Sequence, residues 1–181
     1  PLVVTIVDGG GATSKTATCE ILPKSIKVSG TEAALEDLEQ INLGTIKLAD
    51  YADAQILNFA ITLPDGVTNQ SNVTEAKVDL QFPGLITRDF AITGEQIRIV
   101  NVPEGMEAVL ITENLTVTVR GPITDINRMT IRDLTLTVDF TDAAMGTATY
   151  KLIVTFPEAF STVGALGKPN VSATLQEAED S

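Results

Sequence analysis

The sequence contains no histidine and no tryptophan, and it has a single cysteine. Without histidine, the chain lacks the most common general base, the most common metal ligand and any Ser-His or Cys-His pair. Cys19 cannot form an internal disulfide, and its strand-like surroundings favour a small buried hydrophobic role over a reactive thiol. We therefore predict that the chain is not an enzyme and has no catalytic, cofactor-binding or metal-binding residues and no cofactor.

Aromatic residues make up only 4% of the chain, whereas 44% of the residues are hydrophobic. The core must therefore be built from Val, Ile and Leu, and the β-branched members of this group favour strands. No hydrophobic run is long enough to span a membrane, and no signal peptide is recognisable. Because the chain begins with Pro1 rather than Met, we expect it to be a piece of a longer protein.

The formal net charge is −12 and the calculated isoelectric point is about 4.3. Acidic residues outnumber basic residues in both halves of the chain. Such a surface repels nucleic acids and anionic membranes. We therefore predict no nucleic-acid partner.

One stretch, 115–140, shows the local organisation most clearly. Leu115, Val117 and Val119 alternate with polar residues, which predicts a half-buried strand with Arg120 on the polar side. The Gly121-Pro122 pair is expected to end this strand. Apolar residues then recur three apart over Ile123–Met129 and predict a short helix, and the alternation returns over 134–140.

The same order of features occurs earlier in the chain when Gly30 is aligned with Gly121. A second helix is predicted over Thr31–Gln40, with an apolar stripe that reaches Ile41. Alternating runs predict strands over 2–7, 16–22, 25–29, 45–49, 55–63, 73–82, 97–99, 106–112, 148–156 and 171–175.

The repeat predicts two tandem β modules, residues 1–83 and residues 84–181, rather than one sandwich. The second module would end in an acidic tail over 176–181. The segment 84–92 has no counterpart in the first half. It is either a linker or a first strand that module one lacks.

Two patterns could carry chemistry. Asp8 and the three glycines that follow it could form a phosphate loop, but no such motif continues, so a turn is predicted. The pairs Asp50/Asp53 and Asp139/Asp142 could bind calcium or act as paired acids on a glycoside. Because no calcium-loop spacing and no aromatic sugar platform accompany them, we interpret these aspartates as turn caps.

The repeated unit resembles the YbbR-like domain family. The residues that carry this resemblance are Thr116–Pro122 before a short helix, Leu136–Phe140 and Val154–Pro157, with Pro23–Gly30, Ile46–Leu48 and Ile61–Gly66 as their counterparts in module one. The resemblance implies an all-β fold, mainly β with one short helix per module, built from elongated crossed-strand modules. It implies no catalytic residues.

The resemblance also implies a mostly Gram-positive bacterial protein with several modules behind an N-terminal membrane helix. The modules would lie on the extracytoplasmic side of the cell membrane, and the parent protein would regulate a membrane diadenylate cyclase, which makes cyclic di-AMP. The expected partner is thus a protein, such as that cyclase, and membrane contact would occur only through the N-terminal helix. Two alternatives stay open: a surface adhesion or spacer module without a signalling role, and a fragment of an enzyme.

Overall fold

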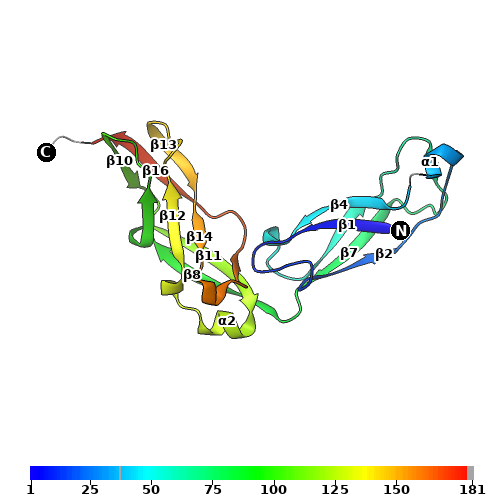
Figure 1. Cartoon of the computed structure of the whole chain (residues 1–181), viewed down its shortest axis with the longest axis horizontal. Helices are drawn as coiled ribbons and strands as arrows, with labels where there is room; N and C mark the ends of the chain where they lie inside the picture. Colours follow the sequence, from blue (N-terminus) through cyan, green and yellow to red (C-terminus); the bar gives the residue numbers. More distant parts are fainter. Residues whose placement is uncertain (37, 179–181) are drawn as a thin grey trace. The chain divides into compact units, whose positions relative to one another are not determined.

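The computed structural model describes residues 1–36 and 38–178. The chain divides into two compact units, Pro1–Gly84 (unit 1) and Leu85–Ser181 (unit 2). Both consist mainly of β-strands and each contains one short α-helix (Figure 1). The predicted all-β class is therefore confirmed.

Unit 2 contains three sheets of three strands each, in the orders β15-β11-β8, β14-β12-β9 and β10-β16-β13. The pair β9 and β12 is parallel, and the other pairs are antiparallel. Its elements are β8 (Leu85–Thr93), β9 (Ile97–Val100), β10 (Met106–Leu110), β11 (Asn114–Pro122), α2 (Ile123–Arg128), β12 (Thr135–Asp139), β13 (Gly146–Lys151), β14 (Ile153–Thr155), β15 (Gly164–Ala165) and β16 (Asn170–Glu177).

Unit 1 repeats much of this arrangement with fewer strands. Its sheets have the orders β1-β4, which is parallel, β2-β7-β5 and β3-β6, which are antiparallel. Its elements are β1 (Leu2–Val7), β2 (Thr18–Leu22), β3 (Val28–Gly30), α1 (Glu32–Glu36), β4 (Ile41–Lys47), β5 (Gln55–Ala60), β6 (Val67–Asn69) and β7 (Glu75–Gln81).

The pairings establish which strands correspond. The parallel pair β1-β4 matches β9-β12, and β3-β6 matches β11-β15. The sheet β2-β7-β5 matches β10-β16-β13, with the last strand of the unit in the centre in both cases. Among the described residues of unit 1, no strand corresponds to β8 or to β14.

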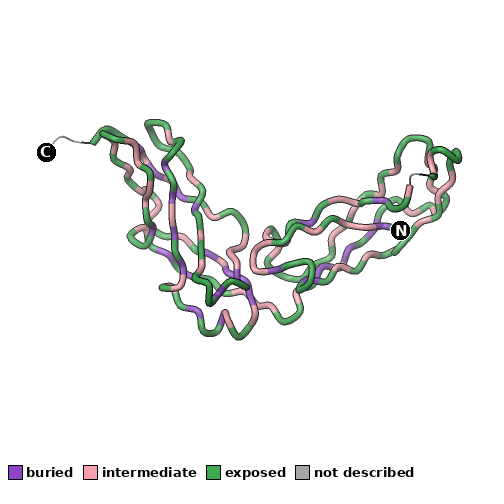
Figure 2. The backbone as a smooth tube through the Cα atoms, viewed as in Figure 1, coloured by how far each residue is buried: buried purple, intermediate pink, exposed green. Residues whose placement is uncertain are grey.

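The core of unit 2 is one cluster of buried Val, Ile, Leu, Phe, Met and Ala side chains. Figure 2 colours the buried residues along the backbone purple. Val117 and Val119 of β11 enter it, as their alternation predicts. Arg120, however, is only 1% exposed, and the prediction that it lies on a polar face was wrong. It pairs with Gly164 of β15, a strand that was not predicted.

Several element boundaries differ from the predictions. The strand before Gly121 does not end there: β11 continues through Pro122, because Gly121 and Pro122 pair with Ile86 and Leu85 of β8. The segment 84–92, taken as either a linker or a strand, is largely β8. The predicted strand 148–156 is split into β13 and β14, which lie in different sheets.

The first helix is shorter than predicted. It covers Glu32–Glu36, and Ile41, expected on its apolar stripe, instead begins β4. Position 37 of the predicted helix lies outside the described residues, as do positions 179–181 of the predicted acidic tail. The second helix ends at Arg128, with Met129 as its C-cap.

Candidate interaction grooves

An open groove of about 670 Å³ lies between β9 and β10 in unit 2. These strands are consecutive in the chain but belong to different sheets, and each is the edge strand of its sheet. Ile97 and Ile99 of β9 and Ala108 and Leu110 of β10 supply apolar lining. We call this site the β9–β10 groove.

Unit 1 has a groove of about 500 Å³ beside the matching strand β2, where Asp79 and Gln81 of β7 also line it. It lies between β1 and β2, which match β9 and β10 and are again edge strands of different sheets. Leu2 lines it from β1, and Cys19 and Ile21 line it from β2. We call this site the β1–β2 groove.

The register relates one lining residue of each groove to the other. Cys19 pairs with Leu80 of β7, and Ala108 pairs with Leu175 of β16. Leu80 and Leu175 are the last buried residues of the central strands. Cys19 and Ala108 therefore occupy matching positions, and both line a groove.

Carboxylates surround both grooves. Glu95, Glu107 and Glu113 line the β9–β10 groove, and Glu20 and Asp79 line the β1–β2 groove, which also holds Lys24. Edge strands carry unpaired backbone groups that can pair with another chain. An extended segment with apolar and basic side chains would match this lining in both shape and charge.

Cys19 is less buried than predicted, because it is only partly buried in β2 and lines the β1–β2 groove. Desolvation by its surroundings raises the pKa of the Cys19 thiol. The reactive form of cysteine is the thiolate, so a raised pKa lowers its reactivity. The prediction of a non-reactive cysteine agrees with this direction, whereas the predicted buried position is only partly reached.

Of the aspartate pair in unit 2, Asp139 caps a turn, as predicted. Its Oδ1 accepts hydrogen bonds from Thr141 Oγ1 at 2.6 Å, from the Thr141 backbone N–H at 2.9 Å and from Asn101 Nδ2 at 2.9 Å. The bond from the Thr141 hydroxyl, followed by that from Asn101, lowers the pKa of Asp139.

The glycine-rich segment after Asp8 forms a turn, as predicted. The Gly9 N–H donates to Ala12 O at 2.9 Å, and the Ala12 N–H donates back to Gly9 O at 3.2 Å. Asp8 Oδ1 accepts a hydrogen bond from the Ser14 N–H at 2.7 Å. Gly10 and Gly11 have positive φ, which this tight reversal requires.

In residues 1–36 and 38–178, no group of three or more metal-ligating side chains is placed to hold a metal ion. Within those same ranges, no helix has both the length and the apolar character needed to cross a bilayer.

The grooves were not predicted from the sequence. The alternation in β1, β2, β9 and β10 shows which residues face inward, but it does not show that consecutive strands join different sheets. The only available signal was the repeat itself, which places Cys19 and Ala108 in equivalent strands.

Comparison with known proteins gave no match to a protein-family profile and no match to a curated protein. Three solved structures are similar. A YbbR-like domain from Listeria monocytogenes is 20% identical over 52% of this chain and 96% of its own, with a TM-score of 0.42. Domain IV of a YbbR family protein from Desulfitobacterium hafniense is 29% identical over 47% of this chain and 84% of its own, with a TM-score of 0.38.

The third, a YbbR-like protein from Streptococcus pneumoniae, is 8% identical over 97% of this chain and 91% of its own, with a TM-score of 0.34. All three are YbbR-like domain proteins, which is the family that the sequence motifs resemble.

Proposed function

We propose that this chain, which is similar to YbbR-like domain proteins, is a non-catalytic interaction region of a membrane-anchored regulator of diadenylate cyclase. On this proposal the chain lies on the extracytoplasmic side of the membrane. The observation that carries the proposal of an interaction role is the recurrence of one groove, between matching edge strands, in both units.

The grooves favour binding over chemistry. Each combines a partly apolar wall with carboxylates and free strand edges. A partner segment could pair its backbone with β10 or β2 and place alternate side chains in the groove. Basic residues in that segment would meet Glu107 and Glu113 in unit 2 and Glu20 and Asp79 in unit 1.

The choice of diadenylate cyclase as the partner rests on the family resemblance of the sequence motifs. The acidic surface supports a protein partner rather than a nucleic acid, because net negative charge repels phosphate backbones. A surface adhesion or spacer role is the alternative, since tandem β units can serve simply to span distance.

The proposal can be tested in the parent protein with one groove variant and one matched control. Val109 is 42% exposed and lines the β9–β10 groove, whereas Met145 is 60% exposed and does not line it. Val109→Arg should reduce co-purification of the cyclase and change cellular cyclic di-AMP, and Met145→Arg should change neither. Both positions are exposed, so both variants should fold.

Deletion of residues 1–181 with the membrane helix retained should reproduce the effect of Val109→Arg. If removal of the whole parent protein leaves cyclic di-AMP unchanged, the regulatory role is wrong and the spacer alternative replaces it. If the deletion changes cyclase co-purification and cyclic di-AMP but Val109→Arg changes neither, the β9–β10 groove is not the contact surface.

A further inference from the structure

Strand β13 forms one edge of the sheet β10-β16-β13, and in the described part of unit 2 no strand pairs with its other side. It lies at the opposite edge from β10, with β16 between them. Thr147, Thr149 and Lys151 of this strand are exposed. An exposed edge strand can pair with a strand from another chain.

The hydrogen bonds of β16 show which backbone groups of β13 point to the free edge. Ser172 of β16 is paired with Thr149. Its C=O accepts from the Ile111 N–H at 2.9 Å and its N–H donates to Thr112 Oγ1 at 2.8 Å, both on the side of β10. In an antiparallel pair, successive residues direct their backbone groups to opposite sides. The N–H and C=O of Thr149, and by the same alternation those of Lys151, therefore face away from β16.

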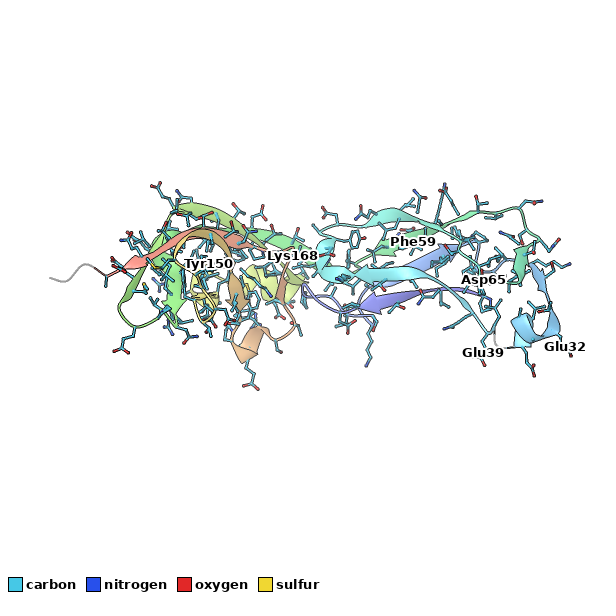
Figure 3. All side chains as sticks on the ribbon, turned by 90° about the horizontal axis from the view of Figure 1, so that it is seen from above. Glu32, Glu39, Phe59, Asp65, Tyr150 and Lys168 are labelled. Carbon is cyan, nitrogen blue, oxygen red and sulfur yellow. The ribbon has the colours of Figure 1, made fainter. Side chains whose placement is uncertain are left out.

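A pocket of about 450 Å³ lies at the C-terminal end of β13. Figure 3 shows the side chains of this region, with Tyr150 and Lys168 labelled. A strand added to β13 would pass beside the pocket and could place a side chain in it. The lining residues are Thr149, Tyr150 and Lys151 of β13, and Lys168, Pro169 and Asn170 before and at the start of β16.

The pocket is basic, although unit 2 as a whole has more acidic than basic residues. Lys151 and Lys168 are the only two lysines of unit 2, and both line the pocket. None of its described lining residues is acidic. Within residues 1–36 and 38–178, neither lysine belongs to a salt bridge. Two cations without a carboxylate partner attract a negatively charged group.

Unit 1 has the same backbone arrangement at this point. The Leu152 N–H donates to Pro169 O at 2.9 Å, and the Ile61 N–H donates to Thr74 O at 2.8 Å. Pro169 and Thr74 each directly precede the central strand of their sheet, so the two bonds match.

The charges of the pocket are not repeated in unit 1. Counted from the matching bonds, Lys151 corresponds to Ala60 and Lys168 corresponds to Val73. Neither of these residues carries a charge. The two lysines are therefore a feature of unit 2 alone and are not required by the fold that the units share.

The two faces of an added strand would meet different charges. Successive side chains of a strand alternate, so Tyr150 points to the opposite face of β13 from Lys151. Tyr150 also lines a second pocket, of about 290 Å³, together with Asp139 and Asp142 at the end of β12. An acidic side chain on that face would be repelled by the two aspartates. A matching strand therefore carries its carboxylates only on the face of Lys151.

We propose that the free edge of β13 is a docking site for an extended segment of a partner protein, which joins the sheet as a further strand. The segment has acidic side chains at alternate positions, on the face of Lys151, and none on the face of Tyr150. Backbone pairing with Thr149 and Lys151 aligns the segment, and the lysines select its charge. The site is separate from the β9–β10 groove and does not depend on the function proposed for that groove.

The test uses the whole chain and the peptide TEVEVET, in which glutamates occupy alternate positions. One control peptide, TVVEEET, has the same composition without alternation, and a second, TKVKVKT, has lysine in place of each glutamate. At saturation, TEVEVET should slow deuterium exchange at the amides of Thr149 and Lys151 at least about tenfold, and neither control should do so. Equal protection by TEVEVET and TVVEEET, or none by TEVEVET, would overturn the proposal.

Two variants separate the charges from the strand edge. Lys151→Gln combined with Lys168→Gln should weaken binding of TEVEVET about tenfold. Lys47→Gln combined with Lys77→Gln, which removes two exposed lysines of unit 1, should leave binding unchanged. Thr149→Pro removes an N–H that faces the free edge and not one that bonds to β16, so it should abolish the protection at Lys151. Thermal unfolding shows whether each variant is folded.

Two further outcomes would assign the site to another occupant. If inorganic phosphate displaces TEVEVET and folded Thr149→Pro binds the peptide as the parent does, the lysines form an anion site only, and strand addition is overturned. If the chain without peptide associates with itself and this association protects Thr149, a second copy occupies the edge, and the proposal of a separate partner is overturned.

Discussion

Gly121 and Val163 are packed so closely that a Cβ atom on Gly121 would lie 2.6 Å from Val163 Cγ1. The matching Gly30 has the same constraint, because its Cβ would lie 2.7 Å from the carbonyl oxygen of Gly66. Neither glycine has a positive φ. What the two units share at this point is therefore a close contact between the glycine and a neighbouring segment of the same polypeptide, and not an unusual backbone angle.

Replacement of Gly121 by valine should destabilise unit 2 by about 1–3 kcal/mol, because the new side chain overlaps Val163 in a packed core. Denaturant unfolding measures the loss. Val163→Ala should partly relieve the clash, so the double variant should be more stable than the two single effects predict. Strict additivity would show that Val163 is not the source of the cost.

The guanidinium of Arg88 caps the C-terminal carbonyls of α2 and lies 4.9 Å from the centre of the Phe90 ring. Arg88→Met keeps an apolar chain over the ring but removes the donors and the charge at the helix end. The expected loss in unfolding free energy is about 1 kcal/mol, because Arg88 is exposed. The control is Arg98→Met in β9, which is exposed and should change little.

The hydrogen bonds to Asp139 make stability depend on pH in the acid range. Its pKa lies below the ordinary value of 3.8 in the folded chain, so the unfolded chain binds the proton more readily. The contribution is fully present above the unfolded-state pKa and is lost as pH falls through the lower folded-state pKa. Urea unfolding between pH 7 and pH 2.5 should show a shallower acid loss for Asp139→Asn than for the parent.

Asp142→Asn is the matched control for this measurement, because it removes a carboxylate from the same loop. It should retain the acid loss of the parent. An identical pH dependence for the Asp139 variant and the parent would show that the hydrogen bonds from Thr141 and Asn101 do not favour the carboxylate.

Tyr150 packs against Phe140, with ring centroids 4.4 Å apart, and its hydroxyl is buried without a hydrogen-bond partner in the described structure. Tyr150→Phe should leave the free energy of unfolding unchanged or raise it by up to about 1 kcal/mol, because it removes a desolvated polar atom. Phe140→Ala should lower it by about 3–5 kcal/mol through loss of buried area. A clear loss for Tyr150→Phe would indicate that the hydroxyl has a partner.

The sequence predicted strands and faces better than it predicted sheets. The alternation of Val117 and Val119 depends on local geometry, and both side chains are buried. The division between β13 and β14 is not local. Lys151 still pairs with Asn170 of β16, whereas Ile153 pairs with Thr137 of β12, so the run changes sheet at Leu152.

Strand β8 shows a different limit. The repeat left its segment ambiguous because unit 1 offers nothing to compare with Leu85–Thr93. Arg120 shows a third limit: it has the polar character of an outward-facing residue, yet it is buried where β11 pairs with Gly164 of β15. The grooves could not be predicted for the same reason: they depend on how consecutive strands separate into different sheets, which the local sequence does not show.

The central position of β16 also bears on how the chain is made. Its pairing with both β10 and β13 joins Met106 to Glu177 and Lys151 to Asn170. During synthesis on a ribosome, β10 and β13 emerge before β16, the strand that pairs with both. In the same way, β2 and β5 emerge before β7. The sheets β2-β7-β5 and β10-β16-β13 can each be completed only when the last strand of the unit is released, so synthesis should expose unpaired edges until the end of each unit.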